Sequence, residues 1–348
     1  MTPSQRRLLE SLYKTTNQHQ PKASVSKMMD LVTKSKASLT LASYHSLIKR
    51  WNKFCNNNDY SPCPAQSQHL AEFISSLALA AESLAVFQKI LPALKFLHDA
   101  NRIQEPLAID DPFVKLILEG AKREAAARKS RTKKAPSFSQ QDIHKIIDST
   151  IWKQGVGTIG PKPDLVLWRT VVRVFTYYKT FCRFNCYQQL SASDVTFYPD
   201  HICIEFKKAK NDQFYNGTFS LLSALPNSPY CPKLIYSSFF KVMGFLGTSS
   251  EFLNCRILTS KNISRSKPTE KLCYSNSIRD TKNMLQSIGF EGNFSSKSFK
   301  VAWVSKAIEE GVTLLDIQTH GRWRNLETPL IYTQKSKQRR LEVSKHVT

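Results

Sequence analysis

The first 120 residues place apolar side chains at three- and four-residue steps, the spacing that gives a helix one buried face. The pattern occupies residues 44–55, 70–77, 84–97 and a stretch that begins with Phe113, Leu116 and Ile117. Ser38 or Thr40 offers a cap for the first helix, and Pro92 predicts a bend in the third. Four short helices joined by short loops predict a small helical bundle.

From residue 139 onward the pattern changes twice. Ser139 and Asp142 are spaced as in a capping box and predict the start of a new helix. Residues 201–206 and 218–222 are β-rich, and Asn216-Gly217 between them is a strong turn pair. Helical character is found in residues 165–178, 234–245, 276–288, 297–310 and 314–319. We therefore predict a mainly α fold with a small β-hairpin or sheet (α+β).

A basic connector separates the two halves. It contains one acid, Glu124, and seven basic residues: Lys122, Arg123, Arg128, Lys129, Arg131, Lys133 and Lys134. Such a run fits a nuclear import signal, a DNA-backbone contact or a solvated linker, and its position favours a linker that also lies along DNA. The predicted parts are a basic tail (1–35), a helical domain (36–120), a basic linker (121–138), a second domain (139–335) and a basic C-terminal tail (336–348).

The chain is long enough for two domains, with 348 residues, and its 50 Lys and Arg against 27 Asp and Glu give a formal net charge of +23. This surplus predicts a polyanionic partner, nucleic acid before anionic membrane. No run of about 18 apolar residues is present to span a bilayer. The eight cysteines show neither CxxC pairs nor zinc-finger spacing. We interpret them as reduced core residues of an intracellular protein and expect no metal or cofactor.

Two sets of candidate functional residues lie near the predicted hairpin, one before it and one inside it. Arg183 stands in an apolar helical end, eleven residues before Asp194, which precedes a strand. A buried arginine is costly unless it meets an anion, and a core arginine paired with an acid is an equal alternative. Lys207, Lys208 and Lys210 lie at the end of the first strand, where lysines also serve simply to guard a sheet edge.

Two further groups lie near the C-terminus. Lys297 and Lys300 open a predicted helix after Ser295-Ser296, a pattern that also fits an ordinary capped, basic helix start. Gly321-Arg322-Trp323 follows the next helix, and Tyr332 stands nine residues after Trp323. A lone tyrosine is usually packed or on the surface, but this offset, with the other groups in order, predicts a shared site.

In this order the four groups resemble the catalytic boxes of tyrosine recombinases. Lys210-Asn211-Asp212-Gln213 and the Gly-Arg-Trp sequence are most similar to the DIRS-type retrotransposon and crypton branch. The resemblance implies an N-terminal four-helix core-binding (SAM-like) bundle and a C-terminal catalytic domain. It also implies these roles: Tyr332 as nucleophile, Arg183 as phosphate clamp, Lys210 as general acid, Trp323 at the His/Trp position, Lys297 at the histidine position and Lys300 at the second arginine position.

The implied chemistry is metal-free phosphoryl transfer, in which the tyrosine forms a 3′-phosphotyrosyl link that a 5′-hydroxyl later reverses. Fixed cations must then stabilise the charge that grows on the phosphate oxygens. Lys300 keeps a positive charge but lacks the fork of arginine, a loss of about 3 kcal/mol. Lys297 replaces a histidine that would help to move the proton of the tyrosine. His320 and Arg322 are the candidates to compensate for these two replacements.

Three functions are consistent with these residues, in this order of preference. The first is an active recombinase or integrase of a mobile element, the second a DNA-binding descendant that no longer cleaves, and the third a basic scaffold without a DNA role. The expected partners are double-stranded DNA and further copies of the chain, as a tetramer on DNA, without a membrane or small-molecule substrate. The expected location is the nucleus of a eukaryotic host, or otherwise intracellular.

Overall fold

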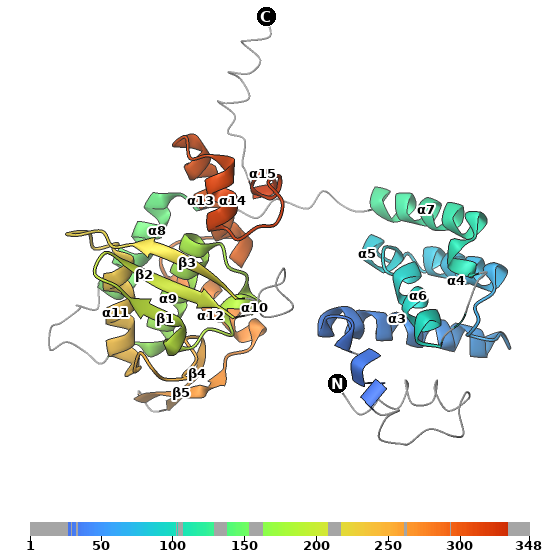
Figure 1. Cartoon of the computed structure of the whole chain (residues 1–348), viewed down its shortest axis with the longest axis horizontal. Coiled ribbons are helices and arrows are strands. Elements are labelled where there is room, and N and C mark those ends of the chain that lie inside the picture. The colour runs from blue at the N-terminus through green and yellow to red at the C-terminus, as the bar shows by residue number, and fades with distance from the viewer. Residues whose placement is uncertain are drawn as a thin grey trace, which may run out of the picture. The chain divides into compact units, whose positions relative to one another are not determined.

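The computed structural model describes residues 27–332 apart from 29, 33, 102, 104–106, 129–137, 153–162, 208–216, 261–262 and 293. The chain divides into two compact units, Met1–Lys133 (unit 1) and Lys134–Thr348 (unit 2) (Figure 1). Helices predominate and the small antiparallel sheets lie in unit 2, which confirms the predicted α+β fold class. Across the described ranges, no helix has both the length and the apolar character to cross a bilayer.

Unit 1 is a helical bundle packed around Trp51. Its helices are α3 (Ser38–Asn57), α4 (Ser67–Leu79), α5 (Leu84–Phe87), α6 (Ile90–Ala100) and α7 (Pro112–Ala127). The Trp51 ring is fully buried and meets Phe73 edge-on, with ring centroids 5.3 Å apart. Its indole N–H donates to the carbonyl of Pro62 at 2.8 Å, so both the apolar and the polar part of the side chain are satisfied.

The third predicted helix is in fact two helices, α5 and α6. The chain turns at Gln88 and Lys89, before Pro92, so the prediction of a helix bent at Pro92 was wrong. Pro92 lies in the first turn of α6. Its missing N–H there costs no intrahelical hydrogen bond, because the first N–H groups of a helix have no partner within it.

The fourth helix, α7, differs from its prediction in face and in length. It buries Val114 and Leu118, whereas Phe113 and Leu116, which were assigned to its apolar stripe, are 64% and 71% exposed. The helix runs to Ala127. The first residues of the predicted linker, 121–127, are therefore helical and belong to unit 1.

Unit 2 is built around α9 (Leu165–Thr180), a helix that is buried along most of its length. The other helices are α8 (Gln140–Ile147), α10 (Phe184–Tyr187), α11 (Pro232–Met243), α12 (Tyr274–Ser287), α13 (Ser296–Glu309), α14 (Leu314–His320) and α15 (Thr328–Tyr332), with short π and 3-10 segments at Asp148–Trp152 and Ala192–Asp194. The predicted start of α8 is confirmed. Ser139 Oγ accepts from the Asp142 N–H at 3.1 Å, and the Asp142 carboxylate accepts from the Ser139 N–H at 2.7 Å.

Two antiparallel sheets accompany these helices (Figure 1). The first has the order β1 (Val195–Phe197), β2 (His201–Phe206) and β3 (Thr218–Ser223), and β2 and β3 confirm the two predicted strands. The second pairs β4 (Cys255–Ser260) with β5 (Ile263–Lys271), and these two strands were not predicted from the sequence. β5 contains Pro268 among charged and hydroxyl residues, so it lacks the alternation by which a strand is recognised.

Two arginines of α9 form a polar centre inside the core of unit 2. Arg169 donates to the Cys255 carbonyl at 2.8 Å and to the Asp280 carboxylate at 2.6 Å. Arg173 donates to Asn254 Oδ1 at 2.9 Å and also to groups of α12. Because these buried charges are hydrogen-bonded, they join α9 to α12 and to β4 instead of opposing folding.

The eight cysteines are free thiols. Five are buried, as expected for reduced core residues: Cys55, Cys182, Cys186, Cys231 and Cys255. Cys273, by contrast, is exposed at the start of α12. The described residues contain no cluster of three or more His, Cys, Asp or Glu side chains that could hold a metal ion.

The first prediction concerns His98, which is fully buried in unit 1. Its Nε2 accepts from the Ala65 N–H at 3.0 Å, and its Nδ1 donates to the Leu94 carbonyl at 2.7 Å. His98→Ala leaves both backbone groups without these partners, so we expect a loss of about 2–4 kcal/mol in the free energy of unfolding. Urea unfolding, with amide exchange at Ala65, measures it. Lys95→Ala, on the exposed face of α6, is the control; equal losses in both variants would contradict the prediction.

Candidate functional site

Helix α13 presents its two candidate lysines differently. Ser295 caps the helix: its Oγ accepts from the Lys297 N–H at 3.3 Å, and its own N–H donates to Ser298 Oγ at 3.2 Å. Lys297, in the first turn, is exposed. Lys300 is only 4% exposed and shares its helix face with the fully buried Val304. The prediction of a capped helix start holds, but one of its two lysines is buried.

Arg183 follows a sharp turn at the end of α9. The helix ends at Thr180, and Phe181 adopts a left-handed backbone conformation with φ 54°. Arg183 is the N-cap of α10 and is half-buried, so it lies between two helices instead of within a helical end. The alternative of a core arginine paired with an acid is not observed: within the described part of the chain, Arg183 forms no ion pair with a carboxylate.

Arg183, Lys300 and Arg322 repel one another electrostatically, and we call these three residues the cationic cluster. Burial lowers the pKa of Lys300 to about 8, and the charges of Arg183 and Arg322 act in the same direction. Burial also lowers the pKa of Arg322, with Arg183 adding to the effect. The nearby Cys182 thiol offers no negative charge at neutral pH, because burial raises its pKa to about 11. Among the described residues, no carboxylate pairs with the cluster, which is therefore suited to an anion.

A stack of aromatic rings links Tyr332 to Phe181 and Trp323, which are close in the chain to Arg183 and Arg322. Its ring is parallel to that of Trp323, with centroids 5.2 Å apart and an interplanar angle of 2°. Trp323 in turn stacks on Phe181 at 5.3 Å and 12°. The Lys297 ammonium lies 6.0 Å from the centroid of the Tyr332 ring. The stack joins the candidate nucleophile to the turn that positions Arg183.

The glycine of the Gly-Arg-Trp sequence has a packing role. A Cβ atom on Gly321 would lie 2.9 Å from ring atoms of Trp323 and 3.0 Å from the Phe181 ring, closer than side chains tolerate. Gly321 thus allows the two rings to stack. The sequence predicts no role for Phe181, because an aromatic residue in an apolar stretch is usually only part of the core. Its single local signal is its position two residues before Arg183.

Of the three candidate lysines near the hairpin, the structure describes only Lys207. Lys207 forms an ion pair with the buried carboxylate of Asp194, and this hydrogen bond raises the pKa of Lys207. Lys207 is therefore engaged at the base of the hairpin. Lys208 and Lys210 lie outside the described residues. The role of Lys210 as general acid stays a prediction.

Of the two candidates for compensation, Arg322 joins the cationic cluster and His320 does not. His320 Nε2 donates to the Lys179 carbonyl at 2.6 Å, and its ring stacks on Trp303 at 5.2 Å. Burial lowers the pKa of His320, which favours the neutral ring. Arg322 carries a guanidinium into the cluster, but its described hydrogen bonds go to groups of the protein itself.

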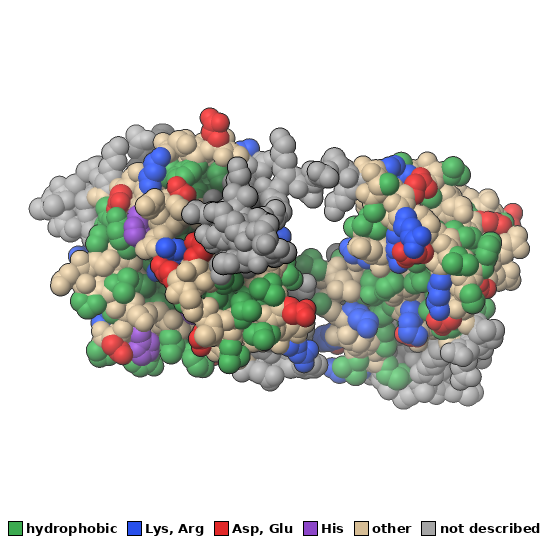
Figure 2. Space-filling view, turned by 90° about the horizontal axis from the view of Figure 1, so that it is seen from above, with side chains coloured by type: hydrophobic (Ala, Val, Ile, Leu, Met, Phe, Trp, Pro, Cys, Tyr) green, Lys and Arg blue, Asp and Glu red, His purple; other side chains and the backbone are tan. Residues whose placement is uncertain are grey.

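The candidate DNA-contacting residues of the connector are described only in part. Lys122 and Arg123 lie on α7, and both lie within 4 Å of the Glu119 carboxylate. Arg128, the C-cap of α7, pairs with Glu124. Figure 2 shows basic and acidic side chains next to one another on unit 1. The other four members, Lys129, Arg131, Lys133 and Lys134, lie outside the described residues.

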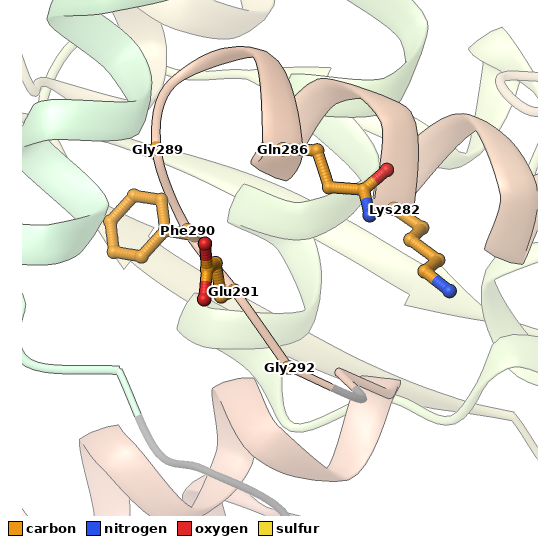
Figure 3. A pocket seen from close by; sticks show the side chains of 6 residues that line it. All are labelled: Lys282, Gln286, Gly289, Phe290, Glu291 and Gly292. Atoms are coloured by element: carbon orange, nitrogen blue, oxygen red, sulfur yellow. The ribbon is translucent and has the colours of Figure 1, made fainter.

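A pocket of about 480 Å³ opens elsewhere on unit 2 (Figure 3). It is lined by Lys282 and Gln286 of α12 and by residues 289–292, which follow that helix. None of the candidate site residues lines it. The cationic cluster and Tyr332 thus do not depend on this pocket, and we assign it no role in their chemistry.

Comparison with known proteins shows the fold. No model of a known protein family and no curated protein matches the chain. The site-specific recombinase XerH, bound to a palindromic difH substrate after cleavage, is 16% identical with a TM-score of 0.60, covering 98% of this chain and 94% of that one. XerH bound to difH before cleavage is 15% identical with a TM-score of 0.54, covering 99% and 90%. The chain therefore has the fold of tyrosine recombinases.

The second prediction follows from the buried charge of Lys300. Its pKa of about 8, against an ordinary 10.5, means that below pH 8 the charge costs the folded state about 3 kcal/mol. Lys300→Met should therefore stabilise the free protein at pH 7. The gain should shrink as pH rises from 8 to 10.5, because the unfolded chain alone then keeps the proton on Lys300.

Urea unfolding at several pH values measures this gain. Inorganic phosphate should stabilise the wild type more than the Lys300→Met variant, because it binds the folded state of the wild type. Lys306→Met, at a position of the same helix where the lysine side chain is 45% exposed, is the control. A Lys300→Met variant that is less stable than the wild type at pH 7 would show that the ammonium has a compensating partner.

Proposed function

We propose that this chain binds double-stranded DNA and transfers DNA strands by the tyrosine-recombinase reaction. The observation that carries the proposal is the cationic cluster, which has no carboxylate partner among the described residues and is linked to Tyr332 through the stacked rings of Phe181 and Trp323. A phosphodiester supplies the anion that such a cluster needs. The XerH complexes support it, since these fold neighbours are structures of a site-specific recombinase bound to its difH substrate.

In the proposed reaction, the Tyr332 oxygen attacks the scissile phosphorus and the bond from phosphorus to the 5′-oxygen breaks. Lys210 donates a proton to the leaving oxygen, and the proton of Tyr332 is released to solvent. The product is a 3′-phosphotyrosyl link and a free 5′-hydroxyl. A 5′-hydroxyl of another strand then attacks the phosphorus and releases the tyrosine.

Two members of the cationic cluster, Arg183 and Lys300, stabilise the charge that grows on the phosphate oxygens during both steps. Arg183 is the member suited to bidentate contact, because its guanidinium presents a planar fork and has no carboxylate partner among the described residues. Lys300 adds a point charge. Lys297 adds a second ammonium near the nucleophile, 6.0 Å from the centroid of the Tyr332 ring. The engagement of Lys207 with Asp194 supports Lys210 over Lys207 as the acid.

A second candidate function is DNA binding without cleavage. It is favoured by the lysine at position 300, because an ammonium cannot bind two phosphate oxygens in the manner of a guanidinium. In either case we propose a mobile element of the DIRS or crypton type as the source of the chain. We also propose a tetramer on DNA and the nucleus of a eukaryotic host as the place of action.

The third prediction tests the nucleophile. Wild-type protein incubated with a nicked duplex, drawn from the ends of the DNA element that encodes it, should form a covalent adduct that migrates slowly on a denaturing gel. Tyr332→Phe should abolish the adduct and leave DNA affinity within about threefold, because the phenylalanine keeps the ring stack but has no oxygen to attack phosphorus.

Tyr198→Phe, at an exposed tyrosine in the turn between β1 and β2, is the matched control and should form the adduct at the wild-type rate. An adduct that persists in Tyr332→Phe would disprove the assigned nucleophile. DNA binding without any wild-type adduct would favour the second function. Weak binding that is insensitive to salt would exclude both functions, because phosphate contacts give a steep salt dependence.

The fourth prediction tests the two lysine replacements. The double variant Lys297→His and Lys300→Arg should raise the rate of adduct formation about a hundredfold, the usual effect of one donor to a developing oxyanion. Quenched time courses on the nicked duplex measure the rate, and thermal unfolding checks that the larger arginine side chain is accommodated at position 300. An unchanged rate in a stably folded double variant would mean that the lysines already perform both tasks.

A further inference from the structure

Arg322 occupies an unusual place between α14 and Trp323. Its backbone is left-handed, with φ 54°, a conformation that residues other than glycine seldom adopt. Its side chain is partly buried in the cationic cluster. Burial lowers the pKa of Arg322, and the charge of Arg183 lowers it further. Neither the backbone nor the charge is favourable by itself, so the contacts of the side chain must hold it there.

The guanidinium joins three separate segments of unit 2. Its Nη2 donates to the Thr180 carbonyl at 2.7 Å, at the end of α9. Its Nη1 donates to Ser220 Oγ on β3 and to the His320 carbonyl, the latter at 3.3 Å. Its Cζ atom lies 4.2 Å from the ring centroid of Phe206, the last residue of β2.

Each of these segments carries a residue of the proposed reaction. Thr180 lies three residues before Arg183, and Lys210 lies in the sequence between β2 and β3. Arg322 is itself adjacent to Trp323, whose ring stacks on Tyr332. A planar group with several donors can hold three segments at fixed distances, whereas an ammonium acts as a single point.

The contact with α9 is a helix cap supplied from far along the chain. The last carbonyls of a helix have no partner within it. His320 donates to the carbonyl of Lys179, and Arg322 donates to the next one, that of Thr180. The end of α9, from which the chain turns through Phe181 to Arg183, is thereby fixed to the segment that leads to the tyrosine.

We infer that Arg322 is a positioning residue, which aligns the phosphate-binding Arg183 with the nucleophile Tyr332 and with the hairpin of the general acid. The expected effect of Arg322 on the reaction rate rests on the proposed strand transfer. Its expected effect on the order of the segments does not. Arg322 acts through the groups that it holds, and its guanidinium is engaged by the protein in the absence of DNA.

The experiment compares the wild type with Arg322→Lys, which keeps the charge and removes the fork. Amide hydrogen exchange of the DNA-free proteins should become at least about tenfold faster in residues 181–186 and 323–332, and stay unchanged in α11. On the nicked duplex, adduct formation should slow about a hundredfold while DNA affinity changes less than about threefold, as expected for a misplaced reacting group. Guanidinium added in solution should partly restore the rate in Arg322→Ala.

Two further variants make the result decisive. Arg279→Lys, at an exposed arginine of α12, is the matched control and should leave exchange and adduct formation unchanged. Ser220→Ala removes only the contact to β3, so exchange should quicken in residues 323–332 but not in 181–186. This milder variant also carries the test if Arg322→Lys does not fold.

Unchanged exchange in both segments of Arg322→Lys would overturn the inference. So would a loss of DNA affinity with exchange unchanged, because Arg322 would then contact phosphate directly. A wild type that forms no adduct would count against strand transfer, yet the exchange measurements would still decide whether Arg322 holds the segments together.

Discussion

Two backbone carbonyls at the end of α9, those of Lys179 and Thr180, accept hydrogen bonds from His320 and Arg322. Helix ends leave such carbonyls without partners, and here the donors come from about 140 residues further along the chain. With the end of α9 fixed in this way, Phe181 turns out of the helix and its ring receives Trp323. The positions of Arg183 and of the ring stack that ends at Tyr332 therefore depend on this junction.

The junction brings three positive charges close together, which lowers the stability of the folded protein but favours the binding of an anion. Lys300 is buried beside two guanidinium groups, and its lowered pKa expresses the cost of its charge in the folded state. The proposed binding of a phosphate beside Lys300 would offset that cost and would link ligand binding to folding stability. An apolar residue at position 300 would make a more stable protein without this site. A buried cation without a carboxylate partner among the described residues is suited to an anionic ligand.

In unit 1, by contrast, the basic residues near the end of α7 lie next to acidic residues. On α7, Lys122 and Arg123 lie near Glu119, and Arg128 pairs with Glu124, at the three- and four-residue spacings that place side chains on one helix face. These three cations share two acids of their own helix, Glu119 and Glu124. The formal charge of +23 therefore does not by itself identify a binding surface, because each cation has to be weighed with its neighbours.

The sequence by itself determined the fold class, strands β2 and β3, the start of α8 and the residue types of the candidate site. Each of these depends on local spacing or on the order of motifs along the chain. It missed β5, whose partner β4 supplies the pairing that its own polar residues do not predict. It misjudged the break before Pro92 and the buried face of α7. Only the tertiary structure decided that Lys300 is buried, that Lys207 pairs with Asp194 and that Arg322 caps α9. The reason is physical: burial and hydrogen-bond partners are set by segments distant in the chain, whereas spacing records only what one segment can do alone.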